Sequence, residues 1–119
     1  MYRVLCVSDD KVFVSNLYDA LSSEAVNGFS EASKEDALGF IEESMPSCLV
    51  LDLRIGLSPA FIIFKALQRA PEASVVILMP EDLKAVIPED NFPGALALRM
   101  PIDSGRLAAQ IRGQLQPRV

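Results

Sequence analysis

Cys48-Leu49-Val50-Leu51-Asp52 is the stretch of sequence that decides the fold. Four apolar residues follow one another without polar alternation, which is typical of a strand covered on both faces in a parallel sheet. The run ends on a carboxylate, and Leu53-Arg54 and a turn of Gly, Ser and Pro follow. In open parallel sheets, ligands bind at the carboxyl ends of the strands, so Asp52 lies at the expected functional edge. Taken alone, the same residue also fits a simple cap at a strand-to-loop junction.

The composition predicts one domain without a nucleic-acid surface. The chain has 119 residues, half of them apolar, and a formal net charge of -5 with no histidine. This length fits a single core and one domain over residues 1–119, with 116–119 as a tail or the start of a linker. Nucleic-acid binding needs clustered Lys and Arg, and the missing histidines remove the usual general base. We therefore expect neither a nucleic-acid partner nor an enzyme.

The cysteines and the N-terminus indicate a cytoplasmic protein. Cys6 and Cys48 lie inside apolar, strand-like runs and do not form a metal-type pair. We expect them to be buried free thiols in a reducing compartment. The N-terminus runs straight into a strand, and no apolar stretch reaches transmembrane length, so no membrane partner is expected.

Four more apolar segments predict strands, over residues 4–7, 25–29, 74–79 and 95–101. Apolar residues at helical spacing separate them, so strands and helices alternate along the chain. Right-handed crossovers then give an α/β, doubly wound sandwich with five parallel strands. We expect a flavodoxin-like strand order, 2-1-3-4-5, in which the first and third strands are neighbours. Pro88 and Pro93 interrupt the segment before the last strand, so the fourth helix is expected to be short or broken.

Sequence signals also predict where the helices begin. Asp9 or Asp10 fits the cap of the first helix, and Ser33 begins a capping box for the second. Ser58-Pro59 is typical of a cap and first helical residue. Asp103 or Ser104 fits the cap of the last helix. The predicted core faces are Phe13, Leu17, Ala20 and Leu21; Ala37, Leu38 and Ile41; Ala60, Ile63, Phe64 and Leu67; and Leu107, Ala108, Ile111 and Leu115.

Two apolar residues of the third helix fall outside its core face. Ile62 points almost opposite the core stripe, and Phe61 lies on its flank. These surplus apolar side chains are candidates for an interaction surface, with a crystal-packing patch or an extra core layer as the alternatives.

The strand order predicts an acidic pocket. Neighbouring strands lie about 4.8 Å apart, so Asp9 and Asp10 after the first strand share one cleft with Asp52 after the third. Three carboxylates there repel one another unless their pKa values rise or a hard divalent cation neutralises them. Such a cluster suits Mg²⁺ and a phosphoryl group, with one acid as nucleophile. The alternative is a set of solvated caps.

Four stretches of the sequence share a pattern with a known family. They are Arg3-Val4-Leu5-Cys6-Val7-Ser8-Asp9-Asp10, Leu49-Val50-Leu51-Asp52, Gly94-Ala95 and Met100-Pro101-Ile102-Asp103. In these stretches the chain resembles the receiver domain of two-component response regulators, and the resemblance covers nearly its whole length. The resemblance implies that Asp52 accepts phosphate and that Asp9 ligates Mg²⁺, with Asp10 nearby. The backbone carbonyl of Arg54 would complete the protein ligands.

Four positions depart from the family pattern. Ser8 stands where the first acid is usual, although a register shifted by one residue would instead pair Asp9 with Asp10. Met79 replaces the usual Thr or Ser, Ala97 the switch aromatic and Met100 the lysine. A hydroxyl and a cation that would follow the phosphoryl group are thereby lost. Alternatively, the two methionines are core filler in a receiver that is phosphorylated with reduced efficiency.

These departures favour an atypical receiver, or pseudo-receiver, that acts through protein contacts. We expect it to be the N-terminal part of a larger bacterial signalling protein, with an output domain, a protein partner or a second copy as its contact. No cofactor is required, and Mg²⁺ binding should be weak. One alternative is a receiver that accepts phosphate on Asp52 from a histidine kinase. Another is a flavodoxin-like binding domain, although Asp9 and Asp10 would repel a cofactor phosphate.

Overall fold

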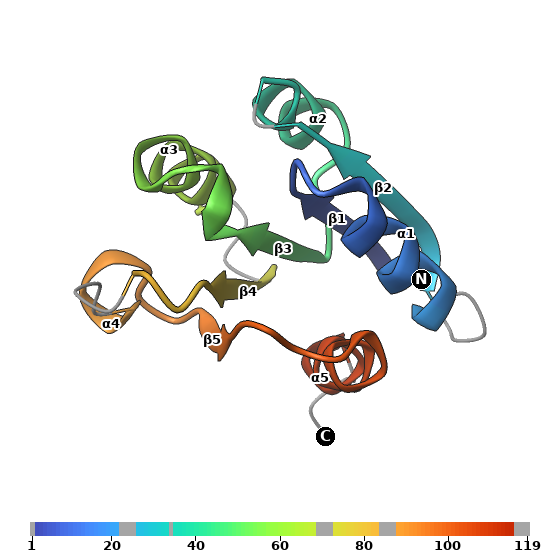
Figure 1. Ribbon diagram of the computed structural model, residues 1–119. Coiled ribbons are helices and arrows are strands. Elements are labelled where there is room, and N and C mark those ends of the chain that lie inside the picture. The colour runs from blue at the N-terminus through green and yellow to red at the C-terminus, as the bar shows by residue number, and fades with distance from the viewer. Residues whose placement is uncertain (1, 22–25, 34, 69–72, 84–87, 116–119) are drawn as a thin grey trace.

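A five-stranded parallel sheet forms the centre of the computed structural model in Figure 1, which describes residues 2–21, 26–33, 35–68, 73–83 and 88–115. The strands run in the order β2-β1-β3-β4-β5, as predicted, and every neighbouring pair is parallel. Their bounds are β1 (Tyr2–Val7), β2 (Val26–Ala32), β3 (Cys48–Asp52), β4 (Ser74–Met79) and β5 (Leu96–Arg99).

Helices cover both faces of this sheet (Figure 1). One face carries α1 (Lys11–Leu21) and α5 (Ser104–Leu115), and the other carries α2 (Ala37–Glu43), α3 (Leu57–Leu67) and the short α4 (Pro88–Asn91). Strand β3 sends Leu49 and Leu51 into the core beneath α2 and α3, and Cys48 and Val50 into the core beneath α1 and α5. All five of its residues are buried, which explains the unbroken apolar run.

Both cysteines are buried and neither forms a disulfide, as predicted. They lie in the core beneath α1 and α5. Burial raises the pKa of the Cys48 thiol to about 12, because a thiolate would lose its hydration there. No helix in the described ranges is long and apolar enough to cross a bilayer.

The start of α3 differs from the prediction. A 3₁₀ turn, η1 (Leu53–Ile55), follows β3, and the helix begins at Leu57 after Gly56. Ser58 is therefore not its cap. Gly56 has φ 113°, a left-handed conformation that glycine adopts without steric cost, so the helix begins two residues earlier than expected. Pro59 falls in the first turn, where its missing N–H is not needed.

The capping box predicted for α2 is also wrong. The helix begins at Ala37, with Asp36 as its cap residue and no side-chain capping bond. The Ser33 carbonyl instead accepts the N–H groups of Asp36 and Ala37, so Ser33 closes a turn before the helix. Leu38 lies largely at the surface because the short helix buries Ala37 and Ile41, which are four residues apart.

The predictions of the second and fifth strands and of a short fourth helix are largely confirmed. Strand β2 extends to Ala32, beyond the predicted end at residue 29, and Ala25 lies outside the described residues. Strand β5 is shorter than the predicted 95–101. The described part of α4 has four residues and starts at Pro88, where proline is tolerated. Of the helical turns predicted near 80–86, residues 84–87 lie outside the description.

The core face of α3 is confirmed. Ala60, Ile63, Phe64 and Leu67 are buried. Phe61 and Ile62 are 41% and 54% exposed. The Phe61 ring also packs edge-on against Phe92, with centroids 6.3 Å apart, so part of its surface stabilises the approach of α3 to the end of α4. A role for these two residues in a protein contact stays a prediction.

We expect Ile63→Ala to lower the free energy of unfolding by about 2–5 kcal/mol, because it leaves a cavity beneath α3. The matched change of the neighbouring residue, Ile62→Ala, should alter it by less than about 0.5 kcal/mol, because an exposed side chain is removed. Urea unfolding followed by circular dichroism measures both. Equal losses would show that Ile62 belongs to the core.

Candidate functional site

The candidate site lies where β1 and β3 end side by side. Val7 is opposite Leu51 in the parallel ladder, so the next residues, Ser8 and Asp52, leave the sheet together. Asp52, the acid predicted at this edge, is only 1% exposed. An ionised carboxylate in that position needs hydrogen-bond donors or a cation.

Arg54 supplies most of those donors. Its backbone N–H donates to Asp52 Oδ1 at 3.0 Å, which closes the tight turn into η1. This turn points the side chain back at the same carboxylate. Nε lies 3.1 Å from Oδ1 and 3.0 Å from Oδ2, and Nη2 lies 2.8 Å from Oδ2. The guanidinium thus forms the forked, charge-assisted pairing that arginine makes with carboxylates.

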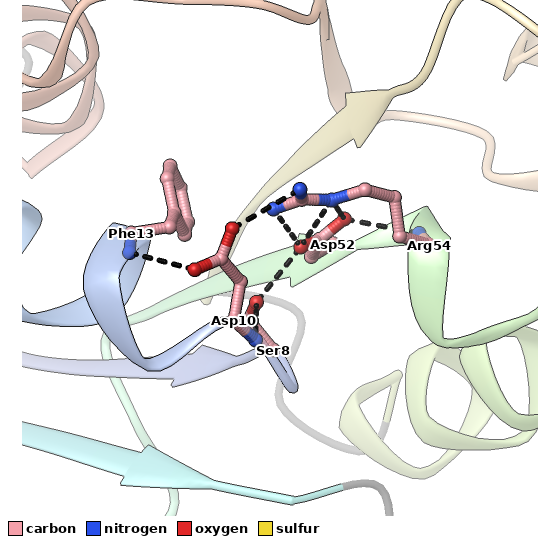
Figure 2. A network of polar contacts seen from close by, with 5 residues as sticks. All are labelled: Ser8, Asp10, Phe13, Asp52 and Arg54. Atoms are coloured by element: carbon pink, nitrogen blue, oxygen red, sulfur yellow. Dashed lines mark hydrogen bonds and ion pairs between the residues drawn. The ribbon is translucent and has the colours of Figure 1, made fainter.

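The same guanidinium reaches the turn after β1 (Figure 2). Arg54 Nη1 lies 3.2 Å from Asp10 Oδ2. Its Cζ atom lies 5.8 Å from the centroid of the Phe13 ring, within range of a cation–π contact. Phe13 is only partly buried, and Val14 takes the core position beside it. One side chain therefore joins the β1–α1 turn to the β3–η1 turn.

Ser8 completes the network as both donor and acceptor. Its hydroxyl donates to Asp52 Oδ2 at 2.8 Å, and its oxygen accepts the backbone N–H of Asp10 at 3.1 Å. Asp10 in turn caps α1, since its Oδ1 accepts the Phe13 N–H at 3.0 Å. Of the two caps left open by the sequence, Asp10 is the one used.

The contacts shift two pKa values. The bond from the Phe13 N–H, followed by the charge of Arg54, lowers the pKa of Asp10, although partial desolvation opposes them. Hydrogen bonds to Asp52 raise the pKa of Arg54. Both shifts favour the charged forms, so the network holds ionised groups at neutral pH.

The structure brings Asp10 and Asp52 together through Arg54 and leaves Asp9 outside this network. The Asp9 side chain is exposed. Its role as a metal ligand stays a prediction, as does that of the Arg54 carbonyl. The sequence reasoning missed the Arg54 side chain. An available signal was charge balance, because a predicted cluster of three acids needs a cation and Arg54 lies only two residues after Asp52.

No protein-family model matches the sequence, and neither does any curated protein. Solved structures do match. The N-terminal domain of the nisin resistance regulator NsrR, a lantibiotic response regulator, has a TM-score of 0.80 at 19% identity over 98% of this chain and 99% of that one. The BeF3-activated DrrB receiver domain gives 0.80 at 20% identity, over 98% and 99%. The chain has the receiver-domain fold. A CheY-like receiver domain protein from Methanospirillum hungatei JF-1 gives 0.78 at 19%, over 97% and 94%.

Receiver domains typically bind Mg²⁺ at the phosphorylation site, so the fit of this pocket to the ion matters. The donor arrangement does not fit it. Both Asp52 oxygens accept bonds from Arg54, and Oδ2 also accepts the Ser8 hydroxyl. Within the described part of the chain, no group of three acidic, histidine or cysteine side chains could hold a metal ion. A positive guanidinium lies between the Asp10 and Asp52 carboxylates, and its charge repels a divalent cation.

The positions that resemble switch residues of receivers pack as apolar side chains. Met79 and Ala97 pack against the core beneath α2 and α3, and Met100 packs against the core beneath α1 and α5. The Met100 N–H donates to the Met79 carbonyl at 2.9 Å and ties the ends of β4 and β5 together. Thioether and methyl groups there offer no strong donor to an anion at Asp52.

Ser8→Ala should lower the free energy of unfolding by about 1–3 kcal/mol, because it removes a donor from buried Asp52 and leaves the Asp10 N–H without its acceptor. The control Ser15→Ala, at an exposed position of α1, should change it by less than about 0.5 kcal/mol. Chemical denaturation of both variants provides the measurement. A neutral Ser8→Ala would show that the Ser8 hydroxyl contributes nothing net.

Asp10 should titrate below its ordinary pKa of 3.8 when carboxyl carbons are followed by NMR. In Arg54→Met the pKa of Asp10 should rise yet stay depressed, because the stronger cause, the Phe13 N–H bond, remains. A depressed folded-state pKa means that ionised Asp10 stabilises the fold above about pH 3.8, and that this contribution is lost as the pH falls through the folded-state value. A wild-type pKa at or above 3.8 would contradict the network.

Proposed function

We propose that this chain is an atypical receiver module that signals through protein contacts and does not switch by phosphorylation. The observation that carries the proposal is the coverage of Asp52 by Arg54 and Ser8. A carboxylate that accepts phosphate must present a free oxygen to the phosphorus atom. Here both oxygens are buried and bonded, so the guanidinium would first have to leave.

The residues around the site support the proposal that the module does not switch by phosphorylation. A phosphoryl group on Asp52 would gain about 1.5–3 kcal/mol from each bond to a charged donor or strong hydroxyl placed to receive it. Met79 and Met100 stand where such groups would be, and Ala97 is too small to change rotamer in response. A phosphorylated Asp52 would be weakly stabilised and would have no route to the surface.

The partner proposed for this module is a protein. The domain of NsrR that matches it is described as that protein's N-terminal domain. By analogy, we place this chain at the N-terminal side of an output domain, in the cytoplasm. Its negative net charge disfavours direct contact with nucleic acid.

Beryllofluoride, a phosphoryl mimic, should be structurally silent in this protein when it is added with Mg²⁺. We expect little or no change in the amide NMR signals of β5 and α4. Both Asp52 oxygens already accept hydrogen bonds from Arg54 or Ser8, and the side chains at Met79, Ala97 and Met100 are apolar. Asp52→Asn should likewise leave biological output nearly intact.

The Asp52→Asn protein is also the control for the spectra, since a shift that persists in it does not arise at Asp52. A saturable shift that spreads from Asp52 to β5 in the wild type would favour a phosphorylatable receiver instead. A stably folded Asp52→Asn protein without output would lead to the same conclusion.

A further inference from the structure

The cation that neutralises the acidic pocket belongs to the chain itself. Arg54 Nη2 lies 2.8 Å from Asp52 Oδ2, and Nη1 lies 3.2 Å from Asp10 Oδ2. One guanidinium thus contacts a carboxylate on each of two turns (Figure 2). A divalent cation with oxygen ligands would have to join the same two turns to neutralise both acids.

The bonding capacity of Asp52 points the same way. An ionised carboxylate offers about four lone-pair positions. Four donors already approach it, namely the Ser8 hydroxyl, the Arg54 backbone N–H, and Nε and Nη2 of the guanidinium. A metal ion could bind Asp52 only by displacing some of them.

Arg54 cannot leave the pocket by losing its proton. Arginine stays charged at every pH at which proteins fold, and bonding to Asp52 raises its pKa further. The Phe13 ring, 5.8 Å from Cζ, adds a contact on the guanidinium. The side chain is 39% exposed, so it can still move outward without unfolding the domain.

We propose that Arg54 is the permanent cation of this pocket and takes the place that receiver domains give to Mg²⁺, so that the two turns are joined without a metal. The inference deepens the proposed function and rests on it, because a module that takes no phosphate needs no metal to hold one. It implies that the guanidinium excludes divalent cations from Asp10 and Asp52.

Thermal unfolding with MgCl₂, against a monovalent salt of equal ionic strength, tests this exclusion. The wild type should show no change in Tm. Arg54→Met should have a lower Tm than the wild type. Mg²⁺ should then raise the Tm of Arg54→Met by about 4–8 °C once the ion exceeds its Kd roughly tenfold. Arg3→Met, which removes the same charge from the exposed start of β1, should behave like the wild type.

Two further variants localise the effect. Adding Asp52→Asn to Arg54→Met should abolish the response to Mg²⁺. Arg54→Gln keeps an amide donor beside Asp52 and replaces Arg54→Met if that protein does not fold. A variant that folds only when Mg²⁺ is present would support the proposal, and one that stays unfolded with Mg²⁺ would count against it.

Two results would overturn the inference. One is a saturable stabilisation of the wild type by Mg²⁺, which would mean that the metal displaces the guanidinium. The other is a folded Arg54→Met or Arg54→Gln protein that does not respond to Mg²⁺. Either result leaves the proposed function standing if beryllofluoride remains silent. A beryllofluoride response in the wild type would remove the proposed function whatever Arg54→Met binds.

Discussion

The hydrogen-bonded ion pair between Arg54 and Asp52 stabilises the buried carboxylate at the end of β3. A carboxylate that is 1% exposed would lose several kcal/mol of hydration if it were left alone in the protein interior. Arg54 offsets this loss from two residues away, and the 3₁₀ turn between strand and helix gives it the direction to do so. The guanidinium is partly exposed, so solvent weakens its pairing with the acids. The same guanidinium nevertheless joins the two turns, since it also contacts Asp10.

The sheet could be predicted from the sequence because its signals are redundant. Strand β3 is apolar on both faces, and the helical stripes of α3 and α5 repeat over three turns, so one misread residue does not change the result. Helix starts were less predictable. Ser33 and Ser58 have the residue type of a cap, but a short hydroxyl side chain serves turns and caps equally well. Where each helix begins depends on the conformation of the neighbouring backbone, as at Gly56 with φ 113°.

The Arg54 side chain was beyond prediction for a different reason. A strand pattern shows which residues reach an edge, but a long side chain can point outward to solvent or back to the site. Here a backbone bond from Arg54 to Asp52 selects the second direction. The acids were predictable as residues at one edge, and their electrostatic partner was not. Charge balance was the one indication of this partner in the sequence. It shows that a cation is needed but not where the arginine side chain points.

The buried thiols allow the opening of this fold to be measured by chemical labelling. Cys6 and Cys48 lie in adjacent strands, fully covered by α1 and α5, and the pKa of Cys48 near 12 leaves almost no reactive thiolate at neutral pH. An alkylating reagent can therefore reach Cys48 only when the central strands separate from their helices. The rate of labelling then reports the opening of the whole domain, and no engineered cysteine is needed. Movement of the Arg54 side chain leaves that rate unchanged.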